Sequence, residues 1–429
     1  MNDKFEYAAS RRKWEPLISP LELLLGLFVT VILPMIVLDL LDLANFWEDL
    51  AVRRTAIAAT IAFVVGWFLL RRLLNLPGVS GAVHGVPIML IAFISAAILL
   101  LIARMEYSRY MLIYSTFVAV AFAYLRPSLA PFSGSGSYHL VPYGKIDVLQ
   151  RVEGLETVLM TEPLVPSAAR VNIVADFRAD LPDEWERMLA QASLRGVPVY
   201  HYKQLTESLT GQVNIEHLSE NFLGSLVPNQ SYTPIKRLID IIGSIILLIV
   251  ASPILVILGF IIWLEDRGPV FYIQTRHGYG GKPFRMYKFR SMTNATPTAI
   301  LDQRESSITK TDDDRITRVG RIIRRIRLDE LPQLLNVLKG EMSLIGPRPE
   351  ANALAEWYDK SLGFYTYRNI VKPGLTGWAQ INQGHVATLE EVNTKLQYDF
   401  YYIKYFSFWL DFLIFMRTIH TVVTGFGSK

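Results

Sequence analysis

Four apolar runs dominate the first third of the chain. They cover Ile18–Leu41, Thr55–Leu70, Val86–Met105 and Arg109–Leu125. Each is close to the ~20 residues that a helix needs to cross a bilayer. The runs carry almost no internal charge, which favours a membrane anchor or a partner surface over an ion or substrate pathway. Residues 1–130 are therefore predicted to form a four-helix transmembrane region.

Basic residues at the ends of these runs predict their orientation. Arg11, Arg12 and Lys13 precede the first run, and Arg71 and Arg72 follow the second. Lysine and arginine accumulate at the cytoplasmic ends of membrane spans. Four crossings then return the chain to the cytoplasm, so the domains that follow are expected on that side.

A segment of alternating strand and helix signals follows the linker PFSGSGSYH. Val171–Phe177 is predicted as a buried strand and Val197–Tyr202 as a second strand. PDEWERMLAQASLRG between them is predicted as a helix that ends at Gly196. This alternation predicts a small Rossmann-like cytoplasmic domain over residues 138–228. No G-x-G-x-x-G follows a strand, so dinucleotide binding has no support in the sequence.

A fifth apolar run, Leu238–Leu264, is long enough to cross the membrane but contains Pro253. Proline removes a backbone donor and clashes with the carbonyl of Ile249, so the helix is predicted to kink there. The hydroxyl of Ser252 can bond back to the carbonyl that this kink releases.

The charges that flank this run predict which side of the membrane its ends occupy. Lys236 and Arg237 precede it, and Arg267 and a basic domain follow it. Both ends are therefore expected on the cytoplasmic face. A re-entrant helix over residues 236–264 satisfies this expectation. The alternative, a kinked fifth crossing, would place the basic domain outside.

The composition agrees with a membrane protein. Of 429 residues, 51% are hydrophobic and 19% are charged, and the net charge is +4. The absence of cysteine excludes disulfides and thiolate metal sites. The seven histidines lack the spacing of metal ligands, so a zinc site is not expected.

Basic residues cluster in two elements of the last part of the chain. PVFYIQTRHGYGGKPFRMYKFRSM predicts a hairpin in which Lys288 and Arg290 share one face, as phosphate clamps or as solvated edge residues. Its GYGGKP turn leads into a strand, so it is not a P-loop. A following run with arginine at every third position predicts an amphipathic helix for anionic surfaces. In a membrane-tethered domain, lipid headgroups and nucleotide phosphates are the expected partners, and nucleic acid is not. The run contains Arg315, Arg318, Arg321 and Arg324.

Two adjacent carboxylates, Asp329 and Glu330, come directly after this basic run, in LDELPQLLNVLKGEMS. Pro332 is tolerated only in a first turn, so a helix is predicted to begin at or just before Asp329 and to end at Gly340. The helix dipole and the arginines favour ionisation of both carboxylates. Adjacent helical residues point about 100° apart, so the pair cannot flank a sugar bond as in a glycosidase. Either one carboxylate attacks phosphorus while the other serves a metal or proton, or Asp329 only caps the helix.

The region from Ser231 to the C-terminus resembles the bacterial sugar transferase family, the polyprenyl-phosphate sugar-1-phosphate transferases. The matching elements are the kinked Ser252-Pro253 helix, YKFRSM, LDELPQLLNVLKGEMS, IGPRPE and KPGLTGWAQIN. With four spans and an α/β domain, the chain is similar to the long, monotopic form that starts exopolysaccharide or O-antigen repeat units. The resemblance implies a membrane α plus α/β fold with a mixed α/β catalytic domain over residues 231–429.

The resemblance also implies a reaction and its residues. Asp329 would attack the sugar-bearing phosphorus of a UDP-sugar and release UMP, and undecaprenyl phosphate would then take the phosphosugar from the aspartyl intermediate. Mg²⁺ would lie beside Asp329 and Glu330. The enzyme would act in the bacterial inner membrane, with its catalytic domain on the cytoplasmic face and with membrane lipids and a second copy of the chain as further partners. The basic active-site positions of the family fall on Lys288, Arg290, Arg324 and Arg348.

Two departures from the family's motifs bear on which sugar is transferred and not on the type of reaction. QGHVA follows QIN where many members have Gly-Arg, and Lys372 replaces a common arginine. Both positions are expected near the sugar pocket. Long-form relatives imply a hexose, glucose or galactose. The alternative function is a catalytically degenerate scaffold for polysaccharide assembly, which the intact dyad and GPRP loop argue against. A transporter is disfavoured by the uncharged spans.

Overall fold

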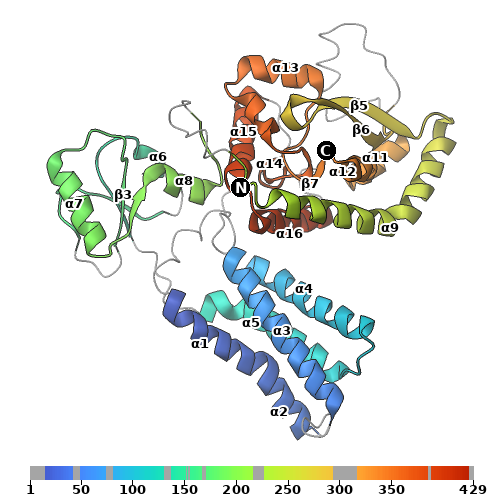
Figure 1. Cartoon of the computed structure of the whole chain (residues 1–429), viewed down its shortest axis with the longest axis horizontal. Coiled ribbons are helices and arrows are strands. Elements are labelled where there is room, and N and C mark those ends of the chain that lie inside the picture. The colour runs from blue at the N-terminus through green and yellow to red at the C-terminus, as the bar shows by residue number, and fades with distance from the viewer. Residues whose placement is uncertain are drawn as a thin grey trace. The chain divides into compact units, whose positions relative to one another are not determined.

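The computed structural model divides the chain into two compact units, Met1–Gly211 and Gln212–Lys429 (Figure 1). It describes residues 15–41, 49–73, 81–129, 137–150, 152, 155–166, 171–215, 227–292, 316–384 and 388–424. Several predicted features lie outside these residues, namely Arg11, Arg12, Lys13, Arg315, most of the PFSGSGSYH linker and the HVA of QGHVA.

The first unit contains the predicted apolar helices. Those long and apolar enough to cross a membrane cover Glu22–Leu40, Leu50–Leu73 and Gly85–Ile102, and a shorter apolar helix covers Arg109–Leu125. The prediction of long apolar helices in this region is therefore confirmed. The elements are α1 (Glu15–Leu27), the π-helical turn η1 (Phe28–Ile32), α2 (Leu33–Leu40), α3 (Leu50–Leu73), α4 (Gly81–Ile102) and α5 (Arg109–Leu129).

Small residues on α3 let these helices approach closely. Ala59 and Ala62 are buried beside Phe63, and a Cβ at Gly26 would overlap the ring of Phe63. Small side chains at helix contacts are typical of membrane bundles, where van der Waals packing replaces the hydrophobic effect. The opposite face of α3 exposes large apolar residues such as Ile57 and Ile61, which suits contact with lipid.

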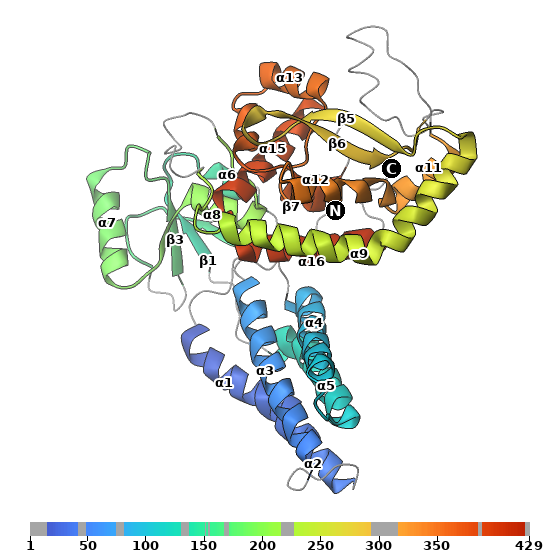
Figure 2. The ribbon, with the colours of Figure 1, turned by 45° about the vertical axis from the view of Figure 1, so that its right-hand side comes forward.

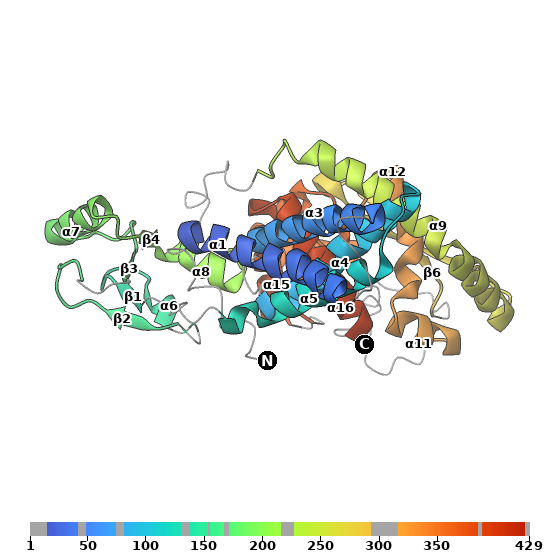
Figure 3. The same ribbon diagram turned by 90° about the horizontal axis from the view of Figure 1, so that it is seen from below.

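The same unit contains a four-stranded parallel sheet in the order β2-β1-β3-β4 (Figure 3). The predicted strands and the helix between them are confirmed. Helix α7 packs on one face through Trp185, and α8 packs on the other through Leu205 (Figure 2). The elements are β1 (Ser137–Leu140), α6 (Asp147–Gln150), β2 (Thr157–Leu159), β3 (Val171–Ala175), α7 (Asp183–Leu194), β4 (Val199–His201) and α8 (Tyr202–Thr210).

Asp176 follows β3, and its side chain reaches the turn that follows β1. Its carboxylate accepts hydrogen bonds from the backbone N–H groups of Lys145 (3.1 Å) and Arg178 (3.1 Å). Gly144, with φ of +77°, packs directly against it. A dinucleotide site uses backbone N–H groups after the first strand to bind phosphate. Here Asp176 accepts from one such group, the N–H of Lys145.

The second unit combines a long helix, a hairpin and several short elements. The predicted hairpin is confirmed as β5 (Phe271–His277) and β6 (Pro283–Phe289), antiparallel, with the turn η3 (Tyr279–Gly281). Strands β7 (Ser343–Ile345) and β8 (Gly374–Thr376) are parallel. The remaining elements are α9 (Thr233–Asp266), α11 (Arg318–Arg325), η4 (Leu328–Gln333), α12 (Leu334–Lys339), α13 (Asn352–Ser361), η5 (Tyr365–Ile370), α14 (Trp378–Asn382), α15 (Leu389–Lys404) and α16 (Phe408–Thr424).

Helix α9 contains the fifth apolar run and bends along its length (Figure 2). Pro253 lies inside it, and the Ser252 hydroxyl donates to the carbonyl of Ile249 at 2.8 Å, as the sequence predicts. Both halves contact the same unit. Near its start Arg237 donates to two carbonyls at the end of α12, and near its end Glu265 accepts from the first N–H groups of α11. Only 6% of its most apolar stretch is buried in the protein.

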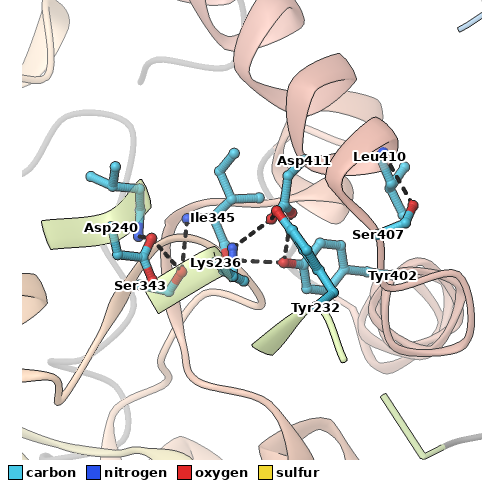
Figure 4. A network of polar contacts seen from close by, with 10 residues as sticks. Tyr232, Lys236, Asp240, Ser343, Ile345, Tyr402, Ser407, Leu410 and Asp411 are labelled. Atoms are coloured by element: carbon cyan, nitrogen blue, oxygen red, sulfur yellow. Dashed lines mark hydrogen bonds and ion pairs between the residues drawn. The ribbon is translucent and has the colours of Figure 1, made fainter. Parts of the chain in front are cut away.

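A buried polar network fixes the first turns of α9 to α16 and β7 (Figure 4). Asp411 of α16 accepts from the Tyr232 hydroxyl (2.7 Å), the Lys236 ammonium (2.7 Å) and the Tyr402 hydroxyl (2.8 Å). One turn further along α9, Asp240 accepts from the Ser343 hydroxyl at 2.9 Å. Helix α9 is thus attached to the rest of the second unit by charge-assisted hydrogen bonds as well as by packing.

Asp411→Ala is expected to destabilise the second unit by about 3–5 kcal/mol, because it leaves the buried Lys236 ammonium without its counter-charge. The side chains of Lys236 and Asp411 are only 9% and 8% exposed. Thermal or urea unfolding in detergent measures the loss. Asp359→Ala, which removes an exposed contact to Thr366 in the same unit, is the control and should change stability by less than about 0.5 kcal/mol. Equal effects of the two substitutions would contradict the prediction.

Candidate active site

The two carboxylates lie in η4, a 3₁₀ turn that precedes the α-helical turns of α12. Asp329 and Glu330 are 9% and 8% exposed. The turn begins at Leu328, after Arg327 with φ of +56°, so Asp329 lies inside it. The alternative that Asp329 is the helix N-cap is therefore wrong. Gly340, with φ of +85°, ends α12 as predicted.

Glu330 is bound by two cations from other elements. Arg348, in the loop after β7, donates Nη1 to Oε2 at 3.2 Å and Nη2 to Oε1. Lys288 of β6 places its ammonium 3.4 Å from Oε1. A two-pronged arginine–carboxylate pair restricts orientation as well as adding energy. The structure thus brings Lys288 and Arg348 together at the dyad.

The electrostatics separate the two carboxylates. Burial opposes ionisation of Glu330, but Arg348 and Lys288 outweigh it and hold its pKa below the ordinary value. Burial and the adjacent charge of Glu330 raise the pKa of Asp329, although Lys288, Arg348 and Arg324 act against this. The prediction that the surroundings favour ionisation is wrong for Asp329, because desolvation and its neighbour outweigh the cations. Glu330 is a fixed anion, and Asp329 is the carboxylate that titrates.

The other predicted cations occupy different surroundings. Arg324 belongs to α11, and its charge acts on Asp329. Arg290 is 7% exposed and lies against Gly268, where a Cβ would overlap its guanidinium. Lys288 therefore reaches the dyad, whereas Arg290 packs where α9 ends. Only glycine fits at Gly268 while Arg290 keeps this position.

Helix α11 forms where the arginine pattern predicts it. Thr317 caps its start by accepting from the N–H of Gly320 at 2.9 Å. Gly320 is required by packing, because a Cβ there would overlap the carbonyl of Ser291. Ile323 is buried against α9, while Ile322 is 65% exposed. The apolar residues are thus divided between the protein core and the surface.

The IGPRPE and KPGLTGWAQIN motifs meet in space. Gly346 donates its N–H to the carbonyl of Thr376 at 2.8 Å, and Gly374 donates to the carbonyl of Pro347 at 2.9 Å. A Cβ at Gly377 would overlap the carbonyl of Gly346. These close contacts hold the loop that carries Arg348. The sequence contains both motifs, but only the fold shows that one supports the other.

A second buried ionic network behind this loop was not predicted. Glu350 pairs with Lys395 of α15, and Arg368 pairs with Asp399 at 2.8 Å. The pKa of Glu350 is lowered to about 2, because Lys395 and Arg368 outweigh the effect of burial. Glu350 is the last residue of IGPRPE, which could have signalled its importance, whereas Arg368 belongs to no motif.

Lys372 lies at the far end of α12 from the dyad. The structure places its ammonium near Gly340, beside the guanidinium of Arg237 that binds the last carbonyls of this helix. Cations at this position complement the negative end of a helix dipole. The dyad, in contrast, precedes the first residue of α12.

The dyad offers carboxylate oxygens, which are ligands that Mg²⁺ prefers. Among the residues that the structure describes, no group of three or more His, Asp and Glu side chains could hold one. Mg²⁺ is commonly bound by one or two carboxylates together with substrate phosphates and water. Asp329 and Glu330 fit a site of that kind, in which the substrate supplies the remaining oxygens.

Comparison with known proteins agrees with this geometry. A family model described as "Bacterial sugar transferase" matches residues 231–425. Along 388 residues the chain is 42% identical to the UDP-N-acetylgalactosamine-undecaprenyl-phosphate N-acetylgalactosaminephosphotransferase of Aeromonas hydrophila, a match that covers 90% of each protein. The chain belongs to the bacterial sugar transferase family.

Other relatives of this sugar transferase match about half of the chain. The UDP-glucose:undecaprenyl-phosphate glucose-1-phosphate transferase of Klebsiella pneumoniae is 43% identical over 197 residues, 45% of this chain and 40% of the relative. The undecaprenyl-phosphate galactose phosphotransferase of Salmonella typhimurium is 34% identical over 246 residues, 55% of this chain and 49% of the relative. The dyad, the hairpin and the GPRP loop all lie in the region that the family model covers.

Proposed function

We propose that this transferase moves a sugar-1-phosphate from a UDP-sugar to undecaprenyl phosphate through a phosphosugar–aspartyl intermediate on Asp329, and so starts the repeat unit of a polysaccharide. The observation that carries the proposal is the unequal dyad. Glu330 is held as an anion by Arg348 and Lys288. Asp329 beside it is the proposed nucleophile, which attacks the sugar-bearing phosphorus. The names of the three relatives support the same substrates.

The proposed reaction has two displacements at one phosphorus. A carboxylate oxygen of Asp329 forms a bond to the sugar-bearing phosphorus, while the bond to the bridging oxygen breaks and UMP leaves with the electron pair. An oxygen of undecaprenyl phosphate then bonds to this phosphorus, and the acyl-phosphate bond breaks to restore the Asp329 carboxylate. Lys288 and Arg348 carry two positive charges, and Glu330 carries one negative charge. The remaining positive charge stabilises the negative charge on the transferred phosphoryl group.

Mg²⁺, held by Asp329 and Glu330, would neutralise the charge of the diphosphate. Removing it with a chelator is therefore expected to abolish turnover, and adding magnesium back should restore it. UMP release measured before and after the addition tests this. Undiminished turnover in excess chelator would contradict a magnesium requirement. Lys288 and Arg348 would then be the groups that neutralise the charge of the diphosphate.

The transferred sugar is proposed from a relative that matches most of the chain. The relative that covers 90% of this chain is named for N-acetylgalactosamine, whereas the glucose relative matches 45%. UDP-N-acetylgalactosamine is thus the first candidate, and the hexoses glucose and galactose are the second. Purified protein with undecaprenyl phosphate and each UDP-sugar in turn should release UMP with one of them. Release with none would favour the alternative of a degenerate scaffold.

We also propose that α9 is re-entrant and that the catalytic unit faces the cytoplasm from the inner membrane. Residues near both ends of α9 bond to the same folded unit, through Arg237 at one end and Glu265 at the other. A straight crossing would separate these ends by the thickness of the bilayer. A helix that enters and leaves by one leaflet lets the dyad reach a lipid phosphate while the UDP-sugar arrives from the cytoplasm.

Reporter tags placed after Lys429 and in the Ser133–Ser137 linker are expected to report the same, cytoplasmic side. Pro253→Leu should straighten α9 and move part of the C-terminal tag to the opposite side, because the kink and its Ser252 hydrogen bond favour the turn. A reporter that is active on only one side of the membrane measures both. Tags on opposite sides in the wild type would contradict re-entrance.

A further inference from the structure

Two arginines bind consecutive carbonyls of the loop that carries Arg348. Arg368 of η5 donates Nη2 to the carbonyl of Arg348 at 2.8 Å. Arg276 of β5 donates Nη1 to the carbonyl of Pro349 at 3.1 Å. Lys395 then binds the side chain of Glu350. Three cations from three separate elements therefore hold three successive residues.

Arg368 is itself held from several directions. Its guanidinium donates to Asp399 of α15 at 3.0 Å through Nε and to the Tyr365 hydroxyl at 2.9 Å through Nη1, in addition to the Arg348 carbonyl. It is 5% exposed, and Asp399 is 1% exposed. The planar fork of arginine can satisfy these directions together, whereas the single ammonium of lysine cannot.

The outer end of this arrangement is the dyad. The side chain of Arg348 donates hydrogen bonds to both oxygens of Glu330, and the carbonyl of Arg348 accepts one from Arg368. The prolines on either side of Arg348 fix their own φ angles, so the loop has little freedom to adjust. A small movement of the Arg348 backbone would displace the guanidinium from Glu330.

We propose that Arg368 and Arg276 are positioning residues of the transfer reaction, which act through Arg348 by fixing the main chain that aims its guanidinium at Glu330. The inference rests on the proposed function, because its measure is turnover. Neither arginine need touch the substrate. Their effect is expected on the chemical step and not on the binding of the UDP-sugar.

The test is a double-mutant cycle on the full-length protein in detergent, with the variants Arg348→Ala, Arg368→Lys and their combination. Arg368→Lys alone should lower kcat by about 10-fold or more, as is typical when the support of an active-site group is removed, with KM for the UDP-sugar within about twofold. In the Arg348→Ala background the same change should lower kcat by less than about twofold, because the side chain that Arg368 aims is gone.

The loss of stability caused by Arg368→Lys, unlike the loss of kcat, should not depend on the residue at position 348. Alanine at position 348 keeps the carbonyl that Arg368 binds, so Arg368→Lys should cost the same in unfolding with either residue at 348. A merely structural role would make the kcat loss equal in the two backgrounds as well, and that result would overturn the proposal. Arg285→Lys, at an exposed arginine of β6, is the matched control and should leave kcat unchanged.

Arg276→Lys provides a second cycle of the same design if Arg368→Lys does not yield folded protein. It should again lower kcat only when Arg348 is present, and an equal loss in both backgrounds would overturn the proposal. Failure of the proposed function has a different signature. Wild-type protein would then release no UMP from any UDP-sugar. If the wild type is active and the losses of kcat in the two single variants add up in the double variant, only the positioning role is contradicted.

Discussion

Asp329→Asn is expected to lower turnover by about 10³-fold or more, as for the loss of a catalytic nucleophile, and to leave the fold intact. An amide cannot form the acyl phosphate, yet it has nearly the same size and lies in the same buried turn. The decisive measurement exposes the protein to UDP-sugar radiolabelled in the sugar, without lipid acceptor, and then denatures it. Wild type should retain label in an alkali-sensitive bond, and Asp329→Asn should not.

Asp359→Asn, at an exposed aspartate of α13, is the control for this experiment and should retain both label and turnover. Full turnover by the wild type with no trapped label under any condition would favour direct attack by the lipid phosphate. Asp329 would then be a metal ligand. Near-normal turnover by Asp329→Asn would remove it from the chemistry altogether.

Glu330→Gln is expected to lower turnover by about 100-fold or more, because it leaves Arg348 and Lys288 beside the nucleophile without their counter-charge. It should also shift the pH profile. Burial and Glu330 raise the pKa of Asp329, so wild-type activity is lost as pH falls through that raised value. Without the charge of Glu330 the cations act on Asp329 alone, its pKa falls, and the acid limb of kcat/KM moves to lower pH.

Measurement of kcat/KM against pH for wild type and Glu330→Gln tests this sign. An acid limb that stays in place or moves to higher pH would contradict the assignment of Asp329 as the titrating group. UDP-sugar binding by Glu330→Gln, measured separately, distinguishes loss of the chemical step from loss of the substrate. Glu341→Gln, at a glutamate after α12 that bonds to Asn336, is the control and should leave the acid limb unchanged.

Local patterns in the sequence predict most of the elements. The apolar runs predict the membrane helices, and alternation around GYGG predicts the β5–β6 hairpin, because both signals are periodic over short stretches. Pro253 and Ser252 predict the kink and its hydrogen bond through contacts within one helical turn. The dyad and the GPRP loop are likewise visible as motifs. The three-domain boundaries and the Rossmann-like assignment stay predictions.

The tertiary structure decided which charges meet. Arg290 is two residues from Lys288 in the sequence, yet Lys288 reaches Glu330 and Arg290 packs against Gly268. The raised pKa of Asp329 arises from burial, which a count of neighbouring arginines does not reveal.

The partner of each buried charge likewise came from elsewhere in the chain. Arg348 reaches Glu330 from 18 residues away, and Arg368 reaches Asp399 from 31 residues away. Such pairs depend on how β7, η5 and α15 pack against one another. A sequence determines the helices, strands and charged groups of this transferase through short-range forces, whereas desolvation and the choice of ionic partner arise only when distant segments bury one another.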